Sequence, residues 1–197
     1  MVRAVVFISG RGSNLEALIK ACESGPLAGI CKIAGVVSNR KGAGGIEKAK
    51  AAGLPTLVLP LSPGQTRENY DSRILQEIAP WSPQLIILAG FDRILSPVMI
   101  KAFPSRIINI HPADPAQFKG LHGYQWAFSQ KLPRTYITVH LVDEGVDTGP
   151  VLDQAEVDLT GIQSLADVEA RGLAVEHQLY PLALAKFITN SQLFKES

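Results

Sequence analysis

The sequence has few cysteines and no long hydrophobic run. Its two cysteines, Cys22 and Cys31, are too few for a four-ligand zinc cluster, and one bridge would be a weak indication of secretion, so we expect reduced thiols. No segment approaches the roughly 20 unbroken apolar residues that a membrane span requires. Residues 1–10 lack the charged and apolar regions of a secretory signal. These absences predict a cytoplasmic protein without a membrane partner.

The sequence also lacks an excess of charge of either sign. Its 19 Lys and Arg residues and 18 Asp and Glu residues are interspersed and give a net charge of +1. Because a dedicated nucleic-acid-binding protein needs a basic surface, we expect small-molecule ligands and no nucleic acid. The 197 residues, 46% of them hydrophobic, suffice for one domain, 1–197, with a substantial core.

Short β-branched segments alternate with segments of helical periodicity up to residue 110. Apolar residues on both faces are typical of strands in a parallel sheet, and we expect strands at 2–8, 32–37, 56–59, 84–89 and 106–110. Helical spacing predicts helices at 14–23, 44–52, 67–78 and 97–103. This alternation predicts an α/β fold, with an open, doubly wound, mostly parallel sheet and helices on both faces.

The pattern changes after residue 110. Residues 135–142 alternate as a half-buried strand, and residues 151–157 follow a glycine-rich turn, so we expect a hairpin-like excursion that completes the sheet. Residues 165–188 predict a closing helix, bent where Pro181 removes a backbone donor. Residues 190–197 are expected to fray. Residues 1–110 and 111–190 therefore form two halves of one domain.

Segments 109–112 and 143–150 contain side chains that suit acyl-group transfer. The imidazole of His111 can take or give a proton near pH 7, the carboxylate of Asp147 can orient it, and the amide of Asn109 can hold a developing oxyanion. Asn109 and His111 stand at i and i+2, so both leave the same face of a strand. Alone, Asp147 is more typical of a turn, and only the joint pattern favours a catalytic site. No second His or Cys stands at ligand spacing from His111, so we predict no metal.

The first predicted strand leads directly into Gly-Arg-Gly-Ser-Asn, residues 10–14, which opens a helix. Glycines let a phosphate approach the backbone, and the free N–H groups and positive dipole end of the helix meet it. The alternative is a tight turn in which Ser13 or Asn14 caps the helix. Both interpretations stay open for this segment alone.

A dinucleotide site is disfavoured by the surrounding residues. It would need a third glycine, where Leu15 stands, and an acidic residue within 38–40. A phosphate monoester is therefore favoured over NAD. Arg11, Arg40 or Arg67 could add positive charge at this end, although each arginine alone is more typical of a solvated surface.

Two further loops and two histidines have both functional and structural interpretations. Residues 90–95 follow a central strand, where ligands of open α/β sheets collect, but an ordinary strand-to-helix loop is favoured. Residues 119–123 contain paired glycines that suggest mobility over a site, or only a turn. His140 is more typical of a satisfied core or interface histidine than of a ligand, and His177 of a surface residue.

Several segments together resemble the phosphoribosylglycinamide formyltransferase family, folate-dependent enzymes of purine synthesis. The Asn-x-His-Pro and Asp-x-Gly-Pro segments are specific to the wider formyltetrahydrofolate-using group, whereas the glycine-rich loop and the Glu-His pair indicate this member. The resemblance extends over nearly the whole chain. The segments that carry it are 10–14, 88–97, 109–112, 120–122, 143–150 and 176–181.

This resemblance implies direct transfer of a formyl group from the co-substrate 10-formyltetrahydrofolate to the amine of glycinamide ribonucleotide, by a monomer or a homodimer. Asn109 would hold the formyl oxygen, His111 would stabilise it and relay a proton, and Asp147 would orient His111. Residues 1–110 would be the phosphate-binding half and 111–190 the folate and catalytic half. The residues implied to bind the ribonucleotide are Gly12, Ser13, Asn14, Arg67 and Glu176. Those implied to border the folate are Arg93, Ile94, Leu95, Val142 and Asp143, within a border that runs along the backbone to Asp147.

The sequence departs from the family at a few positions. Residues 113–116 replace Ser-Leu-Leu-Pro with Ala-Asp-Pro-Ala, Tyr124 and Trp126 replace more polar residues, and Leu173 replaces a polar residue that often helps to hold the ribonucleotide. Another phosphorylated amine is therefore an alternative acceptor. A formyltetrahydrofolate hydrolase would carry an extra amino-terminal domain, and a methionyl-tRNA formyltransferase a basic carboxy-terminal extension. A non-catalytic folate-binding or nucleotide-binding module is the alternative of a different class.

Overall fold

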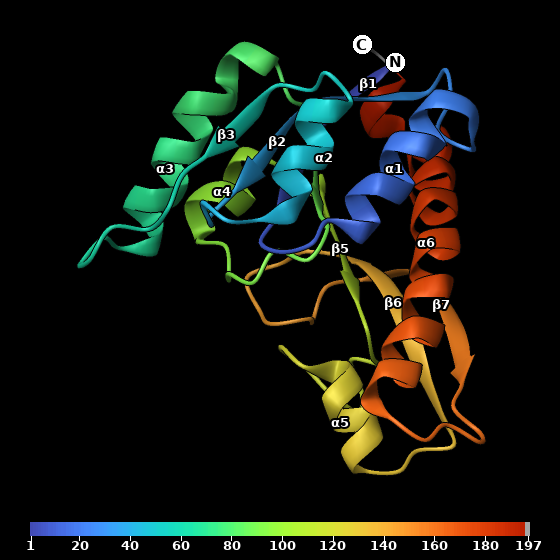
Figure 1. The fold of residues 1–197 in the computed structure, drawn as a ribbon. Coiled ribbons are helices and arrows are strands. Elements are labelled where there is room, and N and C mark those ends of the chain that lie inside the picture. Colours follow the sequence, from blue (N-terminus) through green and yellow to red (C-terminus); the bar gives the residue numbers. More distant parts are fainter. Residues whose placement is uncertain (196–197) are drawn as a thin grey trace.

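The computed structural model describes residues 1–195 and contains one seven-stranded sheet in the order β3-β2-β1-β4-β5-β6-β7 (Figure 1). The parallel strands are β1 (Val2–Ile8), β2 (Cys31–Ser38), β3 (Thr56–Val58), β4 (Leu85–Leu88) and β5 (Ile107–His111). The antiparallel strands β6 (Arg134–Leu141) and β7 (Val151–Asp158) extend one edge. The predicted doubly wound, mostly parallel sheet and its hairpin-like completion are confirmed.

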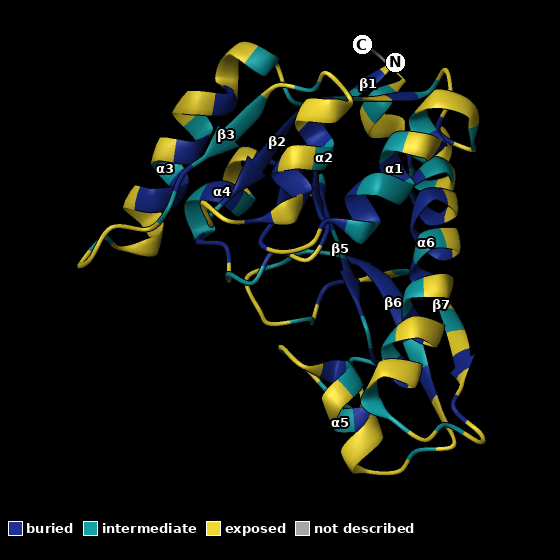
Figure 2. Cartoon of the chain, in the orientation of Figure 1, coloured by how far each residue is buried: buried dark blue, intermediate teal, exposed yellow. Residues whose placement is uncertain are grey.

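Helices cover both faces of this sheet. One hydrophobic cluster joins it to α1 (Ser13–Ser24), α2 (Gly44–Ala51) and α6 (Leu165–Asn190), and the other to α3 (Arg67–Ile78) and α4 (Pro97–Ala102). Strand β1 shows why both layers form, because Ala4 and Val6 pack into the first cluster while Val5 and Phe7 pack into the second. Figure 2 shows the buried strands between the two helical layers.

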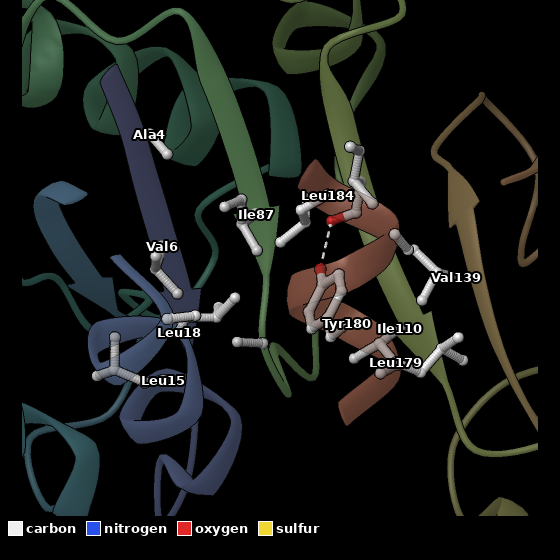
Figure 3. Packing of buried hydrophobic residues seen from close by; sticks show 14 of the residues in the cluster. Ala4, Val6, Leu15, Leu18, Ile87, Ile110, Val139, Leu179, Tyr180 and Leu184 are labelled. Atoms are coloured by element: carbon white, nitrogen blue, oxygen red, sulfur yellow. Dashed lines mark hydrogen bonds between the residues drawn. The ribbon is translucent and has the colours of Figure 1, made fainter. Parts of the chain in front are cut away.

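Local sequence explains how several helices begin and how α6 docks. The side chain of Thr66 accepts a hydrogen bond from Asn69 N at the start of α3, and Ser164 and Asp167 form a capping box on α6. Helix α6 continues through Pro181, which is buried. The Tyr180 hydroxyl lies 3.0 Å from the carbonyl oxygens of both Leu88 and Ile108, and Figure 3 shows its side chain pointing from α6 toward β5. This contact ties the closing helix to the two strands that lead into the site.

Two parts of the second half differ from the sequence-based expectation. The glycine-containing segment 119–123 leads into a short helix, α5 (Gly123–Ser129), which was not predicted. In the tail that the sequence predicts to fray, Ser191 caps the 3-10 helix η2 (Gln192–Phe194), and the ring of Phe194 lies 6.0 Å from that of Phe187. Residues 196 and 197 of the expected tail lie outside the described residues. Another 3-10 helix, η1 (Ala79–Trp81), follows α3.

The apolar layer beneath α3 and α4 stops within β5. Ile107 is the last β5 residue in that cluster, and by strand alternation Asn109 and His111 leave the same face. On the adjacent strand, Ile137 and Val139 pack into the opposite cluster, so the alternate residues face the same way as Asn109. The sheet therefore presents polar side chains where its helical cover ends. Within residues 1–195, no helix is long and apolar enough to cross a membrane.

Candidate active site

A pocket of about 640 Å³ opens beside the carboxyl ends of β4 and β5. This is where ligands collect in open α/β sheets. The loop 90–95, which the sequence alone assigned to an ordinary connection, forms one wall. The pocket is lined by residues from the segments 88–95, 109–112, 120–122 and 140–148.

The three predicted catalytic side chains meet in this pocket. Asp147 Oδ1 lies 3.5 Å from Asn109 Nδ2, and Asp147 Oδ2 lies 3.5 Å from His111 Nδ1. His111 is 3% exposed, so its charge interactions are weakly screened by water. The structure thus brings an amide, an imidazole and a carboxylate together, as the spacing in the sequence suggested.

His140 is a fourth member of this group that the sequence did not identify. Its Nδ1 lies 2.8 Å from the Leu141 carbonyl oxygen, which can only accept, so Nδ1 carries the hydrogen. Its Nε2 lies 3.3 Å from Asn109 Nδ2 and 3.4 Å from Asp147 Oδ1. Asn109 and His140 are directly opposite each other in the β5–β6 register. Only this pairing, which no local pattern encodes, could have identified His140.

The turn between β6 and β7 holds the carboxylate of Asp147 in place. Asp147 has a left-handed backbone with φ of 49°, a conformation that is uncommon outside glycine and concentrates at functional sites. Asp143 Oδ1 accepts hydrogen bonds from Gly145 N at 3.0 Å and Thr148 Oγ1 at 2.6 Å. At Gly149, a Cβ atom would overlap the Leu141 carbonyl oxygen. The turn is therefore built from its own polar side chains and a glycine that permits close backbone approach.

Hydrogen-bond donors determine the ionisation of Asp147. Partial burial tends to raise its pKa. This effect is outweighed by three interactions that lower the pKa: the contact with the His140 side chain, the hydrogen bond from Gly120 N at 2.7 Å, and the charge interactions with His111 and His140. The pKa of Asp147 consequently lies below its ordinary value. An ionised carboxylate is thus available beside the imidazole at neutral pH.

The segment between β5 and α5 closes over His111. His111 Nε2 lies 2.8 Å from the Phe118 carbonyl oxygen, so this nitrogen carries a hydrogen. The ring of Phe118 is nearly parallel to that of His111 and stacks on Trp126 with ring centroids 5.0 Å apart. Together with the Gly120 bond to Asp147, these contacts tie two of the predicted catalytic groups to the backbone of one loop.

A second, smaller hollow of about 190 Å³ adjoins the pocket. Pro112 and His122 line both spaces, which places the hollow next to the catalytic group. Its other lining residues come from the glycine-rich loop, α5 and α6. They are Arg11, Gly123, Tyr124, Gln125, Glu169 and Leu173.

The glycine-rich loop begins α1 without a side-chain cap. Gly12 is the N-cap residue, with a left-handed φ of 72°, so the sequence-based alternative in which Ser13 or Asn14 caps the helix is wrong. A Cβ on Gly12 would lie 2.5 Å from Gly45 Cα, which shows how closely the loop packs on the start of α2. The first N–H groups of α1 are therefore left for another partner, the arrangement that suits an anion.

A buried network lies behind the glycine-rich loop. Glu176, which is 5% exposed, accepts hydrogen bonds from Asn14 Nδ2 and from the Tyr124 hydroxyl. Burial raises the pKa of Glu176, although the donors Tyr124 and Asn14 and the charges on His177 and His111 oppose this effect. Asn14 Oδ1 is buried without a hydrogen-bond partner in the described part of the chain. Two of the predicted ribonucleotide-binding residues are therefore in direct contact.

The predicted folate-border residues all line the large pocket, in different ways. Ile94 is exposed, whereas Leu95 also belongs to the core beneath α3 and α4. The guanidinium of Arg93 lies 5.2 Å from the centre of the Tyr70 ring, a cation–π contact. Val142 packs against the same core, and the Asp143 carboxylate is engaged within its turn.

Two predicted positions are not placed as the sequence suggested. Arg67 begins α3, which packs against α4, and Figure 1 shows this helix away from α1 and α6. Arg67 therefore belongs to a helix on the opposite face of the sheet from α1 and α6, which carry Asn14 and Glu176. His177 is half-buried rather than a surface residue, and its Nε2 has no hydrogen-bond partner among residues 1–195. In the same range, no three His, Cys, Asp or Glu side chains gather as metal ligands.

Comparison with known proteins identifies the family. Residues 2–184 match the formyl transferase family. The chain is 39% identical over 183 residues to phosphoribosylglycinamide formyltransferase of Escherichia coli (strain K12), an alignment that covers 93% of this chain and 85% of that protein. It is 36% identical to the trifunctional purine biosynthetic protein adenosine-3 of Drosophila melanogaster, with coverage of 97% of this chain and 14% of that much longer protein.

Solved structures agree with this assignment. The crystal structure of phosphoribosylglycinamide formyltransferase from Bacillus halodurans superimposes with a TM-score of 0.92 at 32% identity, covering 98% of this chain and 100% of that one. Both the sequence and the fold are thus shared over nearly the whole chain. The chain is therefore a formyltransferase that belongs to the phosphoribosylglycinamide formyltransferase family.

Proposed function

We propose that this enzyme transfers the formyl group of 10-formyltetrahydrofolate to the amine of glycinamide ribonucleotide, a step of purine synthesis. The observation that carries the proposal is that Asn109, His111 and Asp147 meet in the large pocket, and that this pocket shares Pro112 and His122 with a smaller hollow. A transfer reaction needs a donor and an acceptor that meet at one catalytic group. The relatives named above support this choice of substrates.

The large pocket suits the folate. About 640 Å³ lies within the usual range for ligands of this size, and a mainly apolar lining with a few polar groups suits a flat bicyclic ring and its aromatic extension. Arg93, Ile94 and Leu95 would border one side, and Val142 and Asp143 the other. The reactive end of the folate would then reach Asn109 and Asp147.

The glycine-rich loop and the hollow beside it suit the ribonucleotide. The uncapped N–H groups at Gly12, Ser13 and Asn14 would receive the phosphate, and Glu176 would accept hydrogen bonds from the ribose. The amine would extend past Pro112 toward His111. Because Arg67 begins α3, away from this group, we leave it out of the acceptor site.

The chemistry proceeds by direct attack. The amine nitrogen forms a bond to the formyl carbon, and the carbonyl electron pair moves to oxygen, where Asn109 Nδ2 and a protonated His111 stabilise the negative charge. As the carbonyl re-forms, protonated His111 gives its proton to the departing folate nitrogen, whose bond to carbon breaks. The neutral imidazole then accepts a proton from the newly bonded amine nitrogen, so one relay through His111 serves both transfers. Asp147 orients His111 and stabilises its cationic form.

The loop over His111 takes part in this cycle. His111 Nε2 donates to the Phe118 carbonyl oxygen, so this bond must be exchanged before the same nitrogen can serve a reacting group. A segment that closes over the substrates would also exclude water from the intermediate. We also propose that the enzyme is cytoplasmic and that it is a monomer or a homodimer.

A formyl-transfer assay tests the function. Enzyme, 10-formyltetrahydrofolate and glycinamide ribonucleotide are mixed, formation of tetrahydrofolate and formylated acceptor is followed, and one control omits the acceptor. We expect turnover that depends on the acceptor. Folate breakdown without acceptor would indicate a hydrolase instead. Folate binding without turnover would indicate another amine acceptor, such as a different phosphorylated amine, or a binding module.

A further inference from the structure

The smaller hollow has one cationic wall. Among its lining residues, all within the described chain, Arg11 is the only lysine or arginine, and Glu169 is the only carboxylate. The Arg11 side chain is 82% exposed, and its Nη2 lies 3.6 Å from Glu169 Oε2. The Glu169 side chain is half-buried, but a long contact to such an exposed guanidinium is screened by water and contributes little to stability. Arg11 is thus held at the hollow by a weak partner that another anion could replace.

The backbone of Arg11 is packed against the start of α2, although its side chain is exposed. Gly10 O accepts a hydrogen bond from Gly45 N at 3.1 Å, and the Cβ position of Gly44 lies 3.8 Å from Arg11 Cα. Packing of Gly12 against Gly45 completes the contact between the loop and the start of α2. The guanidinium therefore extends from a rigid anchor directly next to the uncapped end of α1.

A second observation concerns Asn14, in the first turn of α1. Asn14 is 7% exposed, and its Oδ1 is buried without a hydrogen-bond partner in residues 1–195, while its Nδ2 is used by Glu176. A buried unpaired acceptor costs free energy unless a ligand or water meets it. On the opposite wall, α6 contributes Glu169 and Leu173, neither of which can neutralise an anion.

We propose that Arg11 binds the phosphate of the acceptor substrate, and that it exchanges Glu169 for this phosphate when the substrate enters. This inference rests on the proposed function, because it takes the acceptor to be a phosphate monoester. A guanidinium offers paired N–H donors that match phosphate oxygens, and two such bonds are stronger than the exposed contact with Glu169. Arg11 thereby supplies a positive charge that the α6 residues at the hollow, Glu169 and Leu173, do not supply, and it selects acceptors that carry a phosphate.

Phosphate binding itself provides the first test. Inorganic phosphate is titrated into the full-length protein, and its Kd is taken from the NMR shifts of the Gly12 and Ser13 amides. We expect Arg11→Gln to weaken phosphate binding about tenfold, because a hydrogen bond to a charged group is typically worth that much. Arg11→Lys should retain part of the affinity. Glu169→Gln should tighten binding about twofold, because the competing anion is lost.

A matched control removes the same charge elsewhere. Arg134 is exposed and pairs with Glu156 at 3.0 Å, at the end of β6 that is remote from the site. Arg134→Gln should leave the phosphate Kd unchanged. Equal Kd values for Arg11→Gln and Arg134→Gln would overturn the proposal, as would a wild-type protein whose Gly12 and Ser13 amides do not respond to phosphate.

Kinetics distinguish this proposal from the proposed function. With glycinamide ribonucleotide, Arg11→Gln should raise the KM for the acceptor about tenfold and leave both kcat and the KM for the folate nearly unchanged. A fall in kcat with unchanged acceptor KM would contradict a binding role. If the wild-type enzyme does not formylate glycinamide ribonucleotide, the proposed substrate is wrong, but the effect of Arg11 on phosphate binding still decides this inference.

Discussion

The large pocket and the buried network behind the glycine-rich loop each contain a carboxylate, Asp147 and Glu176 respectively, and the two carboxylates behave in opposite ways. Asp147 receives a backbone N–H and faces two histidines, so its pKa is lowered in spite of partial burial. Glu176 is more deeply buried, and the donors Asn14 and Tyr124 do not offset the loss of water, so its pKa is raised. Burial alone does not set the charge state of an acid, because the number and charge of its partners decide the sign.

The same comparison separates chemistry from binding. An ionised Asp147 beside His111 can stabilise a cationic imidazole during proton transfer. A buried Glu176, surrounded by neutral donors, is better suited to hold substrate hydroxyl groups in position. Asp147, whose environment favours the ionised form, thus lies at the proposed reaction centre. Glu176, whose environment disfavours the ionised form, lies at the proposed ribose site.

The largest effect is expected from neutralising the carboxylate in the large pocket. Asp147→Asn keeps the size of the side chain but removes the charge beside His111, so turnover should fall on the order of a hundredfold or more. The circular dichroism spectrum should match that of the unchanged protein, because the substitution keeps the fold. Asp158→Asn, at the exposed end of β7, is the control and should retain full activity. Unaltered turnover in Asp147→Asn would remove Asp147 from the mechanism.

A smaller effect is expected from disturbing the turn that carries Asp147. A Cβ at Gly149 would overlap the Leu141 carbonyl oxygen, so Gly149→Ala should shift the turn. We expect the free energy of unfolding to fall by about 1–3 kcal/mol and kcat to fall with it, as measured by urea denaturation and the formyl-transfer assay. Gly42→Ala is the matched control, because its Cβ would meet no atom within 4 Å. Equal losses in both variants would show that the turn is not specially constrained.

The smallest effect concerns the pH dependence of stability, and it tests the comparison directly. The unfolded reference pKa is about 3.9 for Asp and about 4.3 for Glu. Because the folded pKa of Asp147 is lowered, its contribution is present above about pH 3.9 and is lost as the pH falls through the lower folded value. The folded pKa of Glu176 is raised, so its contribution is greatest below about pH 4.3 and declines as the pH rises through the higher folded value.

Urea denaturation over a series of pH values can separate these two contributions. The difference in unfolding free energy between wild type and Asp147→Asn should shrink as the pH falls. The difference between wild type and Glu176→Gln should shrink as the pH rises. Differences that change in the same direction with pH would contradict the opposite pKa shifts of the two carboxylates.

Much of the fold could be predicted from local patterns. The expected helix 67–78 agrees with α3 at both ends, and the expected strands lie within one or two residues of those in the structure. Their apolar residues recur with the period of a strand or a helix and pack into one of two apolar layers. Helix α5 was missed because it is short and follows a glycine-rich segment that resembles a turn.

The site was predicted unevenly, and the differences have a physical reason. Asn109 and His111 share a strand face, so their proximity follows from strand geometry. His140 joins them only because β6 pairs with β5 in one register. Arg67 carries the positive charge expected of a phosphate-binding residue, but helix α3 packs on the face of the sheet opposite α1 and α6.

The sequence by itself determined the order and type of the main elements, the segments that carry the amide, imidazole and carboxylate, and the family to which they belong. Only the tertiary structure decided which charges face one another. Asp147 meets His111 and His140, and Arg11 meets Glu169, through contacts between segments that are distant along the chain. The periodicity of a segment indicates which of its residues are exposed to water and which are buried. The strength of an interaction between two charges depends instead on their distance and burial, and these are determined only by the tertiary structure.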